Sequence, residues 1–96
     1  MTLAQLLGDK RSDILQLAAQ HGARNVRVFG SLARGEARPD SDVDILITLD
    51  PERNLLDLVA LKQDLEDLLG CQVDVVTEAA VSPYIRPQVL RDAMAL

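Results

Sequence analysis

Aromatic residues are almost absent from this chain of 96 residues, which has one Phe, one Tyr and no Trp. Single-stranded nucleic acid usually binds by stacking its bases on aromatic side chains, so the composition disfavours a site of that kind. An excess of positive charge is also lacking, because the formal net charge at pH 7 is −5. Nucleic-acid binding through phosphates needs a basic face. Only a local cluster of Arg27, Arg34 and Arg38 remains for such a role, and we expect no nucleic-acid partner.

Cysteine is nearly absent as well, and Cys71 stands alone. The chain therefore has no disulfide framework, and a reducing compartment is the simplest setting. No segment reaches the roughly 18 apolar residues of a membrane span. The N-terminus lacks the order of basic, apolar and small residues that marks a secretory signal. We expect a soluble cytoplasmic protein without a membrane partner, in which residues 1–96 form a single domain.

The hydrophobic periodicity predicts alternating helices and strands, a pattern typical of an α/β layer arrangement. Aliphatic residues make up most of the 48% hydrophobic content. The expected elements are a helical region Thr2–Gln20 that polar residues 8–13 can divide, a strand Val26–Phe29, a brief helix Ser31–Arg34, a loop Glu36–Ser41, a strand Asp42–Leu49, a helix Asn54–Leu69 with Asn54 as its cap and Gly70 as its end, a strand Cys71–Val76, and a last helix that opens at Ser82-Pro83 unless Pro87 delays its start.

Two carboxylates, Asp42 and Asp44, stand at the start of the most distinct strand. Because side chains alternate along a strand, both share one face and the intervening apolar residues face the core. The same alternation places Asp74 opposite the buried valines of its own strand. If both strands lie in one sheet, the three carboxylates converge. Alone, Asp42-Val43-Asp44 would also fit a solvated strand end.

Three neighbouring carboxylates repel one another, and a divalent cation removes that repulsion. Oxygen ligands of this kind suit Mg²⁺ or Mn²⁺. Two such ions, about 3.5–4 Å apart, can clamp the attacking and leaving oxygens of a phosphoryl transfer. We therefore predict Asp42, Asp44 and Asp74 as metal ligands and catalytic residues.

A turn of small residues, Gly30-Ser31, ends the preceding strand. Glycine lets the backbone approach a ligand closely. The Ser31 hydroxyl and the amides that follow form an anion site of the kind that phosphates occupy, and Arg34 adds a charged donor. Alone, such a pair is typical of a simple turn, and the chain contains neither a Walker loop nor a Gly-x-Gly-x-x-Gly turn. We predict Gly30, Ser31 and Arg34 as nucleotide-binding residues, since phosphate beside a divalent metal indicates nucleotide chemistry.

The ordered set resembles the polymerase-beta-type nucleotidyltransferase superfamily and, within it, the minimal nucleotidyltransferase (MNT) group. The resemblance rests on Gly30-Ser31-x-x-Arg34-Gly35, then Ser41-Asp42-x-Asp44, then a helix, then Asp74 in an apolar strand. It covers essentially the whole chain, and residues 26–49 carry its specific part. It implies a small mixed β-sheet flanked by helices, the polymerase-beta-like core of an α/β (α+β) fold.

The resemblance also implies ATP bound with Mg²⁺. Gly30 and Ser31 would hold the β- and γ-phosphates, and Asp42 and Asp44 would hold the metals. Asp74 would ligate one metal and help to deprotonate an acceptor hydroxyl, which receives the nucleotidyl group as pyrophosphate leaves. Many members of the group are encoded beside a HEPN-domain toxin and act as its antitoxin, in some systems by adenylylating a tyrosine of the toxin.

The chain departs from the family pattern at two positions: Leu32 stands where an Arg is frequent, and Asp92 where a Glu is common. Larger members add a C-terminal domain, for which this chain has no room. We therefore expect a partner to complete the acceptor site, in a hetero-oligomer. Two other functions stay open. One is a non-catalytic antitoxin that neutralises its partner by contact. The other is a nucleotidyltransferase for a small molecule or an RNA end.

Overall fold

The computed structural model describes residues 3–36 and 42–96, and in them four strands form one sheet in the order β3-β2-β1-β4. Their bounds are β1 Ala23–Phe29, β2 Val43–Leu49, β3 Val73–Thr77 and β4 Met94–Ala95. β2 runs parallel to β3 and antiparallel to β1, and β4 pairs antiparallel with β1. The mixed α/β sheet that the family resemblance implies is therefore confirmed.

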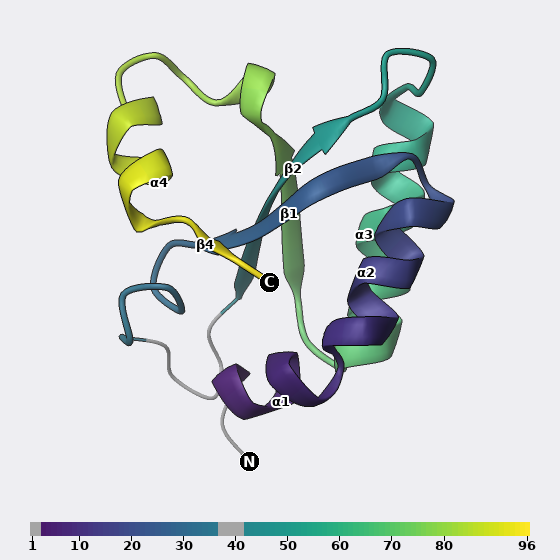
Figure 1. The fold of residues 1–96 in the computed structure, drawn as a ribbon, viewed down its shortest axis with the longest axis horizontal. Helices are drawn as coiled ribbons and strands as arrows, with labels where there is room; N and C mark the ends of the chain where they lie inside the picture. Colours follow the sequence, from purple (N-terminus) through teal and green to yellow (C-terminus); the bar gives the residue numbers. More distant parts are fainter. Residues whose placement is uncertain (1–2, 37–41) are drawn as a thin grey trace.

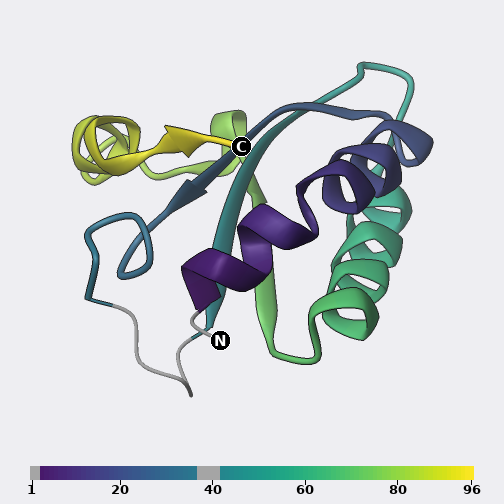
Figure 2. The ribbon, with the colours of Figure 1, turned by 60° about the horizontal axis from the view of Figure 1, so that its bottom comes forward.

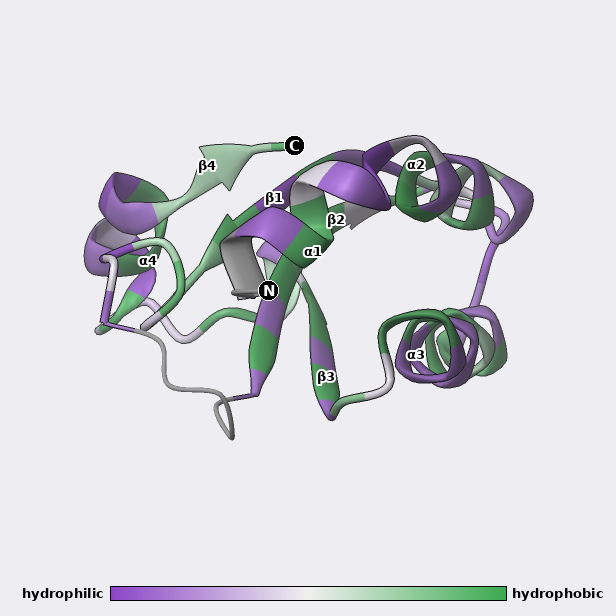
Figure 3. Cartoon of the chain, turned by 90° about the horizontal axis from the view of Figure 1, so that it is seen from below, coloured by the Kyte–Doolittle hydropathy of each residue, from purple (hydrophilic) through white to green (hydrophobic). Residues whose placement is uncertain are grey.

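The helices divide between the two faces of this sheet (Figures 1 and 2). Their bounds are α1 Leu3–Asp9, α2 Arg11–Gln20, α3 Leu55–Leu69 and α4 Arg86–Asp92, with a 3₁₀ helix η1 Glu78–Ala80. Figure 3 shows α2 and α3 together on one side, whereas α4 lies on the other side, next to β4. None of the helices in the described part of the chain is both long and apolar enough to cross a bilayer.

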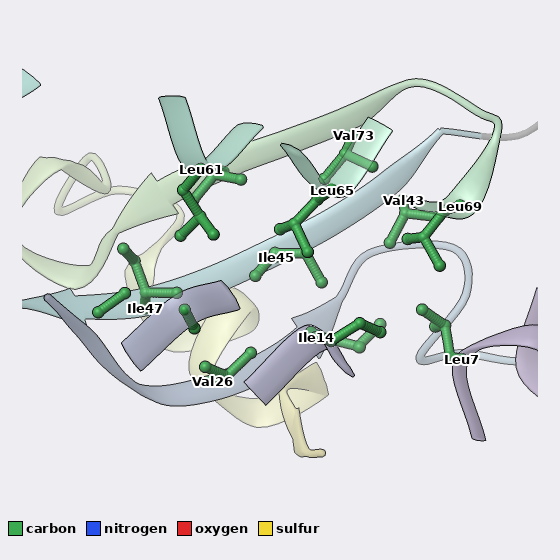
Figure 4. Packing of buried hydrophobic residues seen from close by; sticks show 14 residues of the cluster. Leu7, Ile14, Val26, Val43, Ile45, Ile47, Leu61, Leu65, Leu69 and Val73 are labelled. Carbon is green, nitrogen blue, oxygen red and sulfur yellow. The ribbon is translucent and has the colours of Figure 1, made fainter. Parts of the chain in front are cut away.

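The main core lies between the sheet and the helices α2 and α3 (Figure 4). β2 contributes Ile45 and Ile47 to this core, and α3 contributes Leu61 and Leu65. The spacing of the two leucines places them on one face of the helix. Leu46 points to the opposite face of β2, yet it is fully buried there, and η1 contacts this strand. The part of the sheet near Leu46 is therefore covered on both faces.

The ends of α3 confirm the predicted caps. The Asn54 side chain accepts a hydrogen bond from the amide of Leu56 at 2.9 Å, and the amide of Asn54 donates to the Asp57 carboxylate at 3.1 Å. This reciprocal arrangement satisfies donors that a helix N-terminus otherwise leaves free. Gly70 ends the helix with a φ of 69°, a left-handed conformation that glycine adopts without steric cost. The expected division of the N-terminal helix is also found, at Lys10.

Other expected bounds were wrong or incomplete. β1 begins at Ala23 rather than Val26, because a bulge around Asn25, whose φ is 54°, interrupts the alternation that would reveal the strand. Residues 31–34 form turns instead of a brief helix. The last helix begins at Arg86, in agreement with the delay expected from Pro87, and β4 was not predicted. The predictions on Thr2, Arg38 and residues 37–41, including Ser41, lie outside the described residues.

Candidate functional site

Asp44 and Asp74 are directly aligned across the parallel pair β2–β3. Neighbouring strands lie about 4.8 Å apart, so the two side chains leave the sheet next to each other. Val43 and Val73, which precede them, are fully buried in the core, and so both carboxylates point to the opposite face. The alternation predicted from the sequence is thus present, and it brings these two acids together.

Asp42 precedes β2 and is exposed. Its position is fixed by the following residue, since the amide of Val43 donates to the carbonyl of Gln72 at 3.0 Å. Asp42 is close enough for its negative charge to act on Asp44. The pKa of the Asp44 carboxyl is raised first by partial burial and then by the charges of Asp74 and Asp42. Both other predicted acids therefore lie near enough for their charges to act on Asp44.

This group is a cluster of repelling charges and not a preassembled ligand set. In residues 3–36 and 42–96, no three Asp, Glu, His or Cys side chains converge closely enough to hold a metal ion. The donor chemistry nevertheless fits a hard divalent cation, because carboxylate oxygens are its preferred ligands. A bound cation would also offset the repulsion that, after partial burial, raises the pKa of Asp44.

The Gly30 turn begins beside Asp44, since Phe29, the last residue of β1, pairs with Asp44. Gly30 has a φ of 76°, which disfavours any residue with a Cβ atom. A Cβ atom at Gly30 would also collide with Oδ2 of Asp44. Glycine is thus required here both by the backbone conformation and by the close approach of the predicted catalytic carboxylate.

The turn leaves several backbone donors free. Hydrogen bonds to the carbonyls of residues 30–32 occupy the amides of Arg34 at 3.2 Å, Gly35 at 3.2 Å and Glu36 at 2.8 Å. By contrast, the amides of residues 31–33 and the Ser31 hydroxyl bond no other described residue. Successive free amides of this kind form an anion-binding concavity. The geometry therefore supports phosphate binding at Gly30 and Ser31.

Arg34 is held by two carboxylates. Its Nε donates to Glu36 at 3.2 Å and its Nη1 donates to Asp92 of α4 at 3.2 Å, and these bonds raise the pKa of the guanidinium. The charge of Arg34 also acts on Asp44, whose pKa it lowers in opposition to the neighbouring acids. Sequence reasoning predicted Arg34 but missed Asp92 as its partner. The two residues lie 58 positions apart, and no local pattern links them.

The nucleotidyltransferase domain model matches residues 11–96 of the chain. Among curated relatives, the protein adenylyltransferase MntA of Thermococcus cleftensis is 42% identical over 79 residues, which are 82% of this chain and 80% of the relative. A candidate protein adenylyltransferase of Methanocaldococcus jannaschii is 36% identical over 88 residues, which are 92% of this chain and 95% of the relative.

Solved structures give the same result. A candidate minimal nucleotidyltransferase has a TM-score of 0.87 at 52% identity, with 96% of this chain and 94% of that chain covered. A toxin–antitoxin structure with AMP-PNP has a TM-score of 0.75 at 23% identity, with 88% and 69% covered, and supports the fold alone. The chain therefore belongs to the nucleotidyltransferase domain family, as an enzyme of the minimal nucleotidyltransferase type.

Proposed function

We propose that this chain transfers the AMP group of ATP to a hydroxyl of a partner protein, with tyrosine as the acceptor. The observation that carries the proposal is the alignment of Asp44 with Asp74 beside the free amides of the Gly30 turn. This arrangement puts the carboxylates and the amides that can donate hydrogen bonds to phosphate at the same end of the sheet. The relative from Thermococcus cleftensis that is named a protein adenylyltransferase supports the choice of a protein as acceptor.

In this proposal the Gly30 turn binds the ATP phosphates. The free amides of residues 31–33 and the Ser31 hydroxyl donate to the β- and γ-phosphate oxygens. Nε and Nη1 of Arg34 are bonded to carboxylates, whereas its Nη2 makes no hydrogen bond to a described residue. Nη2 is therefore the donor that Arg34 offers to a phosphate oxygen. Bound in this way, the triphosphate is held next to Asp44.

The acidic residues have two roles. Asp42, Asp44 and Asp74 would hold Mg²⁺, which when bound neutralises negative charge on the phosphates. Asp74 is exposed, and its carboxylate would accept the proton of the acceptor hydroxyl. The hydroxyl oxygen then bonds to the α-phosphorus, the bond between the α-phosphorus and the bridging oxygen breaks, and pyrophosphate leaves.

We propose that the acceptor is a HEPN-type toxin and that the chain acts as its antitoxin, in a hetero-oligomer. The fold is shared with a solved toxin–antitoxin structure that contains AMP-PNP, which supports this direction. The test is to incubate the chain with α-labelled ATP, Mg²⁺ and the product of the adjacent gene. Label should appear on a tyrosine of that product. The double variant Asp42→Asn/Asp44→Asn should lose the transfer, whereas Asp67→Asn, at an exposed position of α3, should retain it.

A second function, neutralisation of the toxin by contact alone, is favoured by the region around α4. Within the described residues α4 has no buried side chain, and Tyr84 and Ile85 before it are exposed by 96% and 54%. Such a surface suits a partner protein. If the triple variant with Asn at positions 42, 44 and 74 still neutralises the toxin at an equimolar dose, contact is sufficient and the catalytic proposal for the antitoxin effect fails.

A further inference from the structure

A cavity of about 600 Å³ opens at the end of β2 and β3 that is remote from Asp44 and Asp74. Its lining includes Thr48 near the end of β2, Thr77 at the end of β3, and Arg86 at the start of α4. Because β2 and β3 are parallel, their carboxyl ends meet at this edge. In α/β sheets, ligands commonly bind just outside the carboxyl ends of such strands.

Arg86 has an incomplete set of partners. Its Nη2 donates to the carbonyl of Val81 at 3.1 Å and to that of Ala79 at 3.4 Å. Its Nε is buried and has no hydrogen-bond partner. In the described part of the chain, no carboxylate pairs with Arg86 and no acceptor meets its Nη1. The buried Nε has no surface that a ligand could contact, and Nη2 is occupied by the two carbonyls, so Nη1 is the donor that Arg86 offers to a group in the cavity.

The other charges of the cavity are already balanced. Asp50 pairs with Arg24 at 3.4 Å, and Glu78 pairs with Arg27 at 3.1 Å. Arg53 pairs with Asp57 at 3.3 Å. Among the described residues that line the cavity, Arg86 is thus the charged side chain that no ion pair compensates.

We propose that this cavity binds the phosphate monoester of a sugar, separately from the predicted nucleotide site. Arginine is well suited to phosphate because its planar group offers several donors. The volume lies within the range of roughly 300–1,000 Å³ that is usual for small-molecule sites, and it exceeds what a single oxyanion would fill. Asp50, Glu78 and Thr48 line the same cavity and bring oxygen acceptors for sugar hydroxyls, beside the apolar residues Leu49 and Pro51.

The inference can be tested without reference to the proposed catalysis. Ribose 5-phosphate is titrated into the full chain in the presence of EDTA, by calorimetry and by NMR of the backbone amides. Saturable binding is expected, with shifts at Thr48, Thr77 and Glu78. Arg86→Gln should weaken the affinity roughly tenfold or more, through loss of charged hydrogen bonds. Arg91→Gln is the matched control, since Arg91 lies on the same helix, is exposed and bonds no described residue.

Further ligands and variants separate the sources of binding. Asp44→Asn should bind ribose 5-phosphate as the wild type does. AMP is compared with ribose 5-phosphate. If the two bind equally, the ligand is recognised as a sugar phosphate, as proposed; if AMP binds more tightly, the site recognises a nucleotide instead. Absence of saturable binding, or shifts centred on Ser31 that disappear in Asp44→Asn, would overturn the proposal. Equal affinity for inorganic phosphate or for ribose would also refute the assigned ligand class. If Arg86→Gln does not fold, Arg86→Lys and the wild-type shift map decide the question.

Discussion

Replacement of Gly30 by Ala should destabilise the protein more than replacement of Gly35 by Ala. Both glycines have nearly the same positive φ, 76° and 75°. An Ala at Gly35 meets nothing within 4 Å, whereas an Ala at Gly30 collides with Oδ2 of Asp44. Gly35→Ala therefore measures the cost of the backbone conformation alone, and Gly30→Ala adds the cost of moving Asp44.

The magnitude follows from these two contributions. A left-handed conformation costs a residue with a Cβ atom about 1–2 kcal/mol, which is the loss expected for Gly35→Ala. Overpacking adds about 1 kcal/mol, the low end of its usual range, because the colliding oxygen is the end of a side chain that can turn away, so Gly30→Ala should lose about 2–3 kcal/mol in total. In a domain of this size, each kcal/mol lowers Tm by roughly 4–8 °C.

Urea and thermal denaturation of the two variants measure this difference. In the background Asp44→Ala the colliding oxygen is absent, so the excess loss at Gly30 should disappear. Gly30→Ala should also lose nucleotidyl transfer, because Asp44 must leave its position. Equal losses of stability for the two alanine variants in the wild-type background would show that the close approach of Asp44 adds no cost at Gly30, and this reasoning would be wrong.

Three other predictions concern the charged groups. Without ligand, Asp44→Asn should be as stable as the wild type or slightly more stable, because the change removes a partly buried charge that neighbouring acids repel. The increase in Tm on adding Mg²⁺ with ATP should be smaller in this variant. An undiminished increase would exclude Asp44 from the site. Asp92→Asn should raise KM for ATP with little change in kcat, because Arg34 loses a bond that orients it; Asp92→Glu should restore KM, and Arg91→Gln should not alter it. The pKa of Glu66 is lowered by hydrogen bonds from Lys62 and from the backbone amide of Val73. The contribution of Glu66 to stability is therefore present above its ordinary pKa and is lost as the pH falls through the lower pKa of the folded state. Urea unfolding of Glu66→Gln should therefore show a weaker acid dependence than the wild type, and an identical dependence would contradict this reasoning.

The elements that the sequence predicts well are those defined by neighbouring residues. The helix α3 has its leucine stripe, its Asn54 cap and its Gly70 end within one segment. That Asp44 and Asp74 both point away from the core could be predicted from alternation, because a strand repeats every two residues and its buried face is apolar, whereas their direct alignment depends on the parallel register of β2 and β3.

The features that escaped prediction depend on distant residues or on irregular backbone. β4 is two residues long and exists because it pairs with β1, about 67 positions earlier. The bond between Arg34 and Asp92 depends on where α4 lies, and the bulge at Asn25 depends on the pairing of β1 with β2. The single domain and the metal-binding and catalytic roles of Asp42, Asp44 and Asp74 stay predictions.

The parallel register of β2 and β3 has a consequence for how reliably the enzyme is made. The residues that alternate with the acids are the core residues Val43, Ile45, Val73 and Val75. A slip of one position in either strand would separate Asp44 from Asp74 and would also turn the apolar side chains of that strand away from the core. A one-residue slip therefore costs the chain its core packing together with its site, so the stability of the fold selects against molecules with that misalignment.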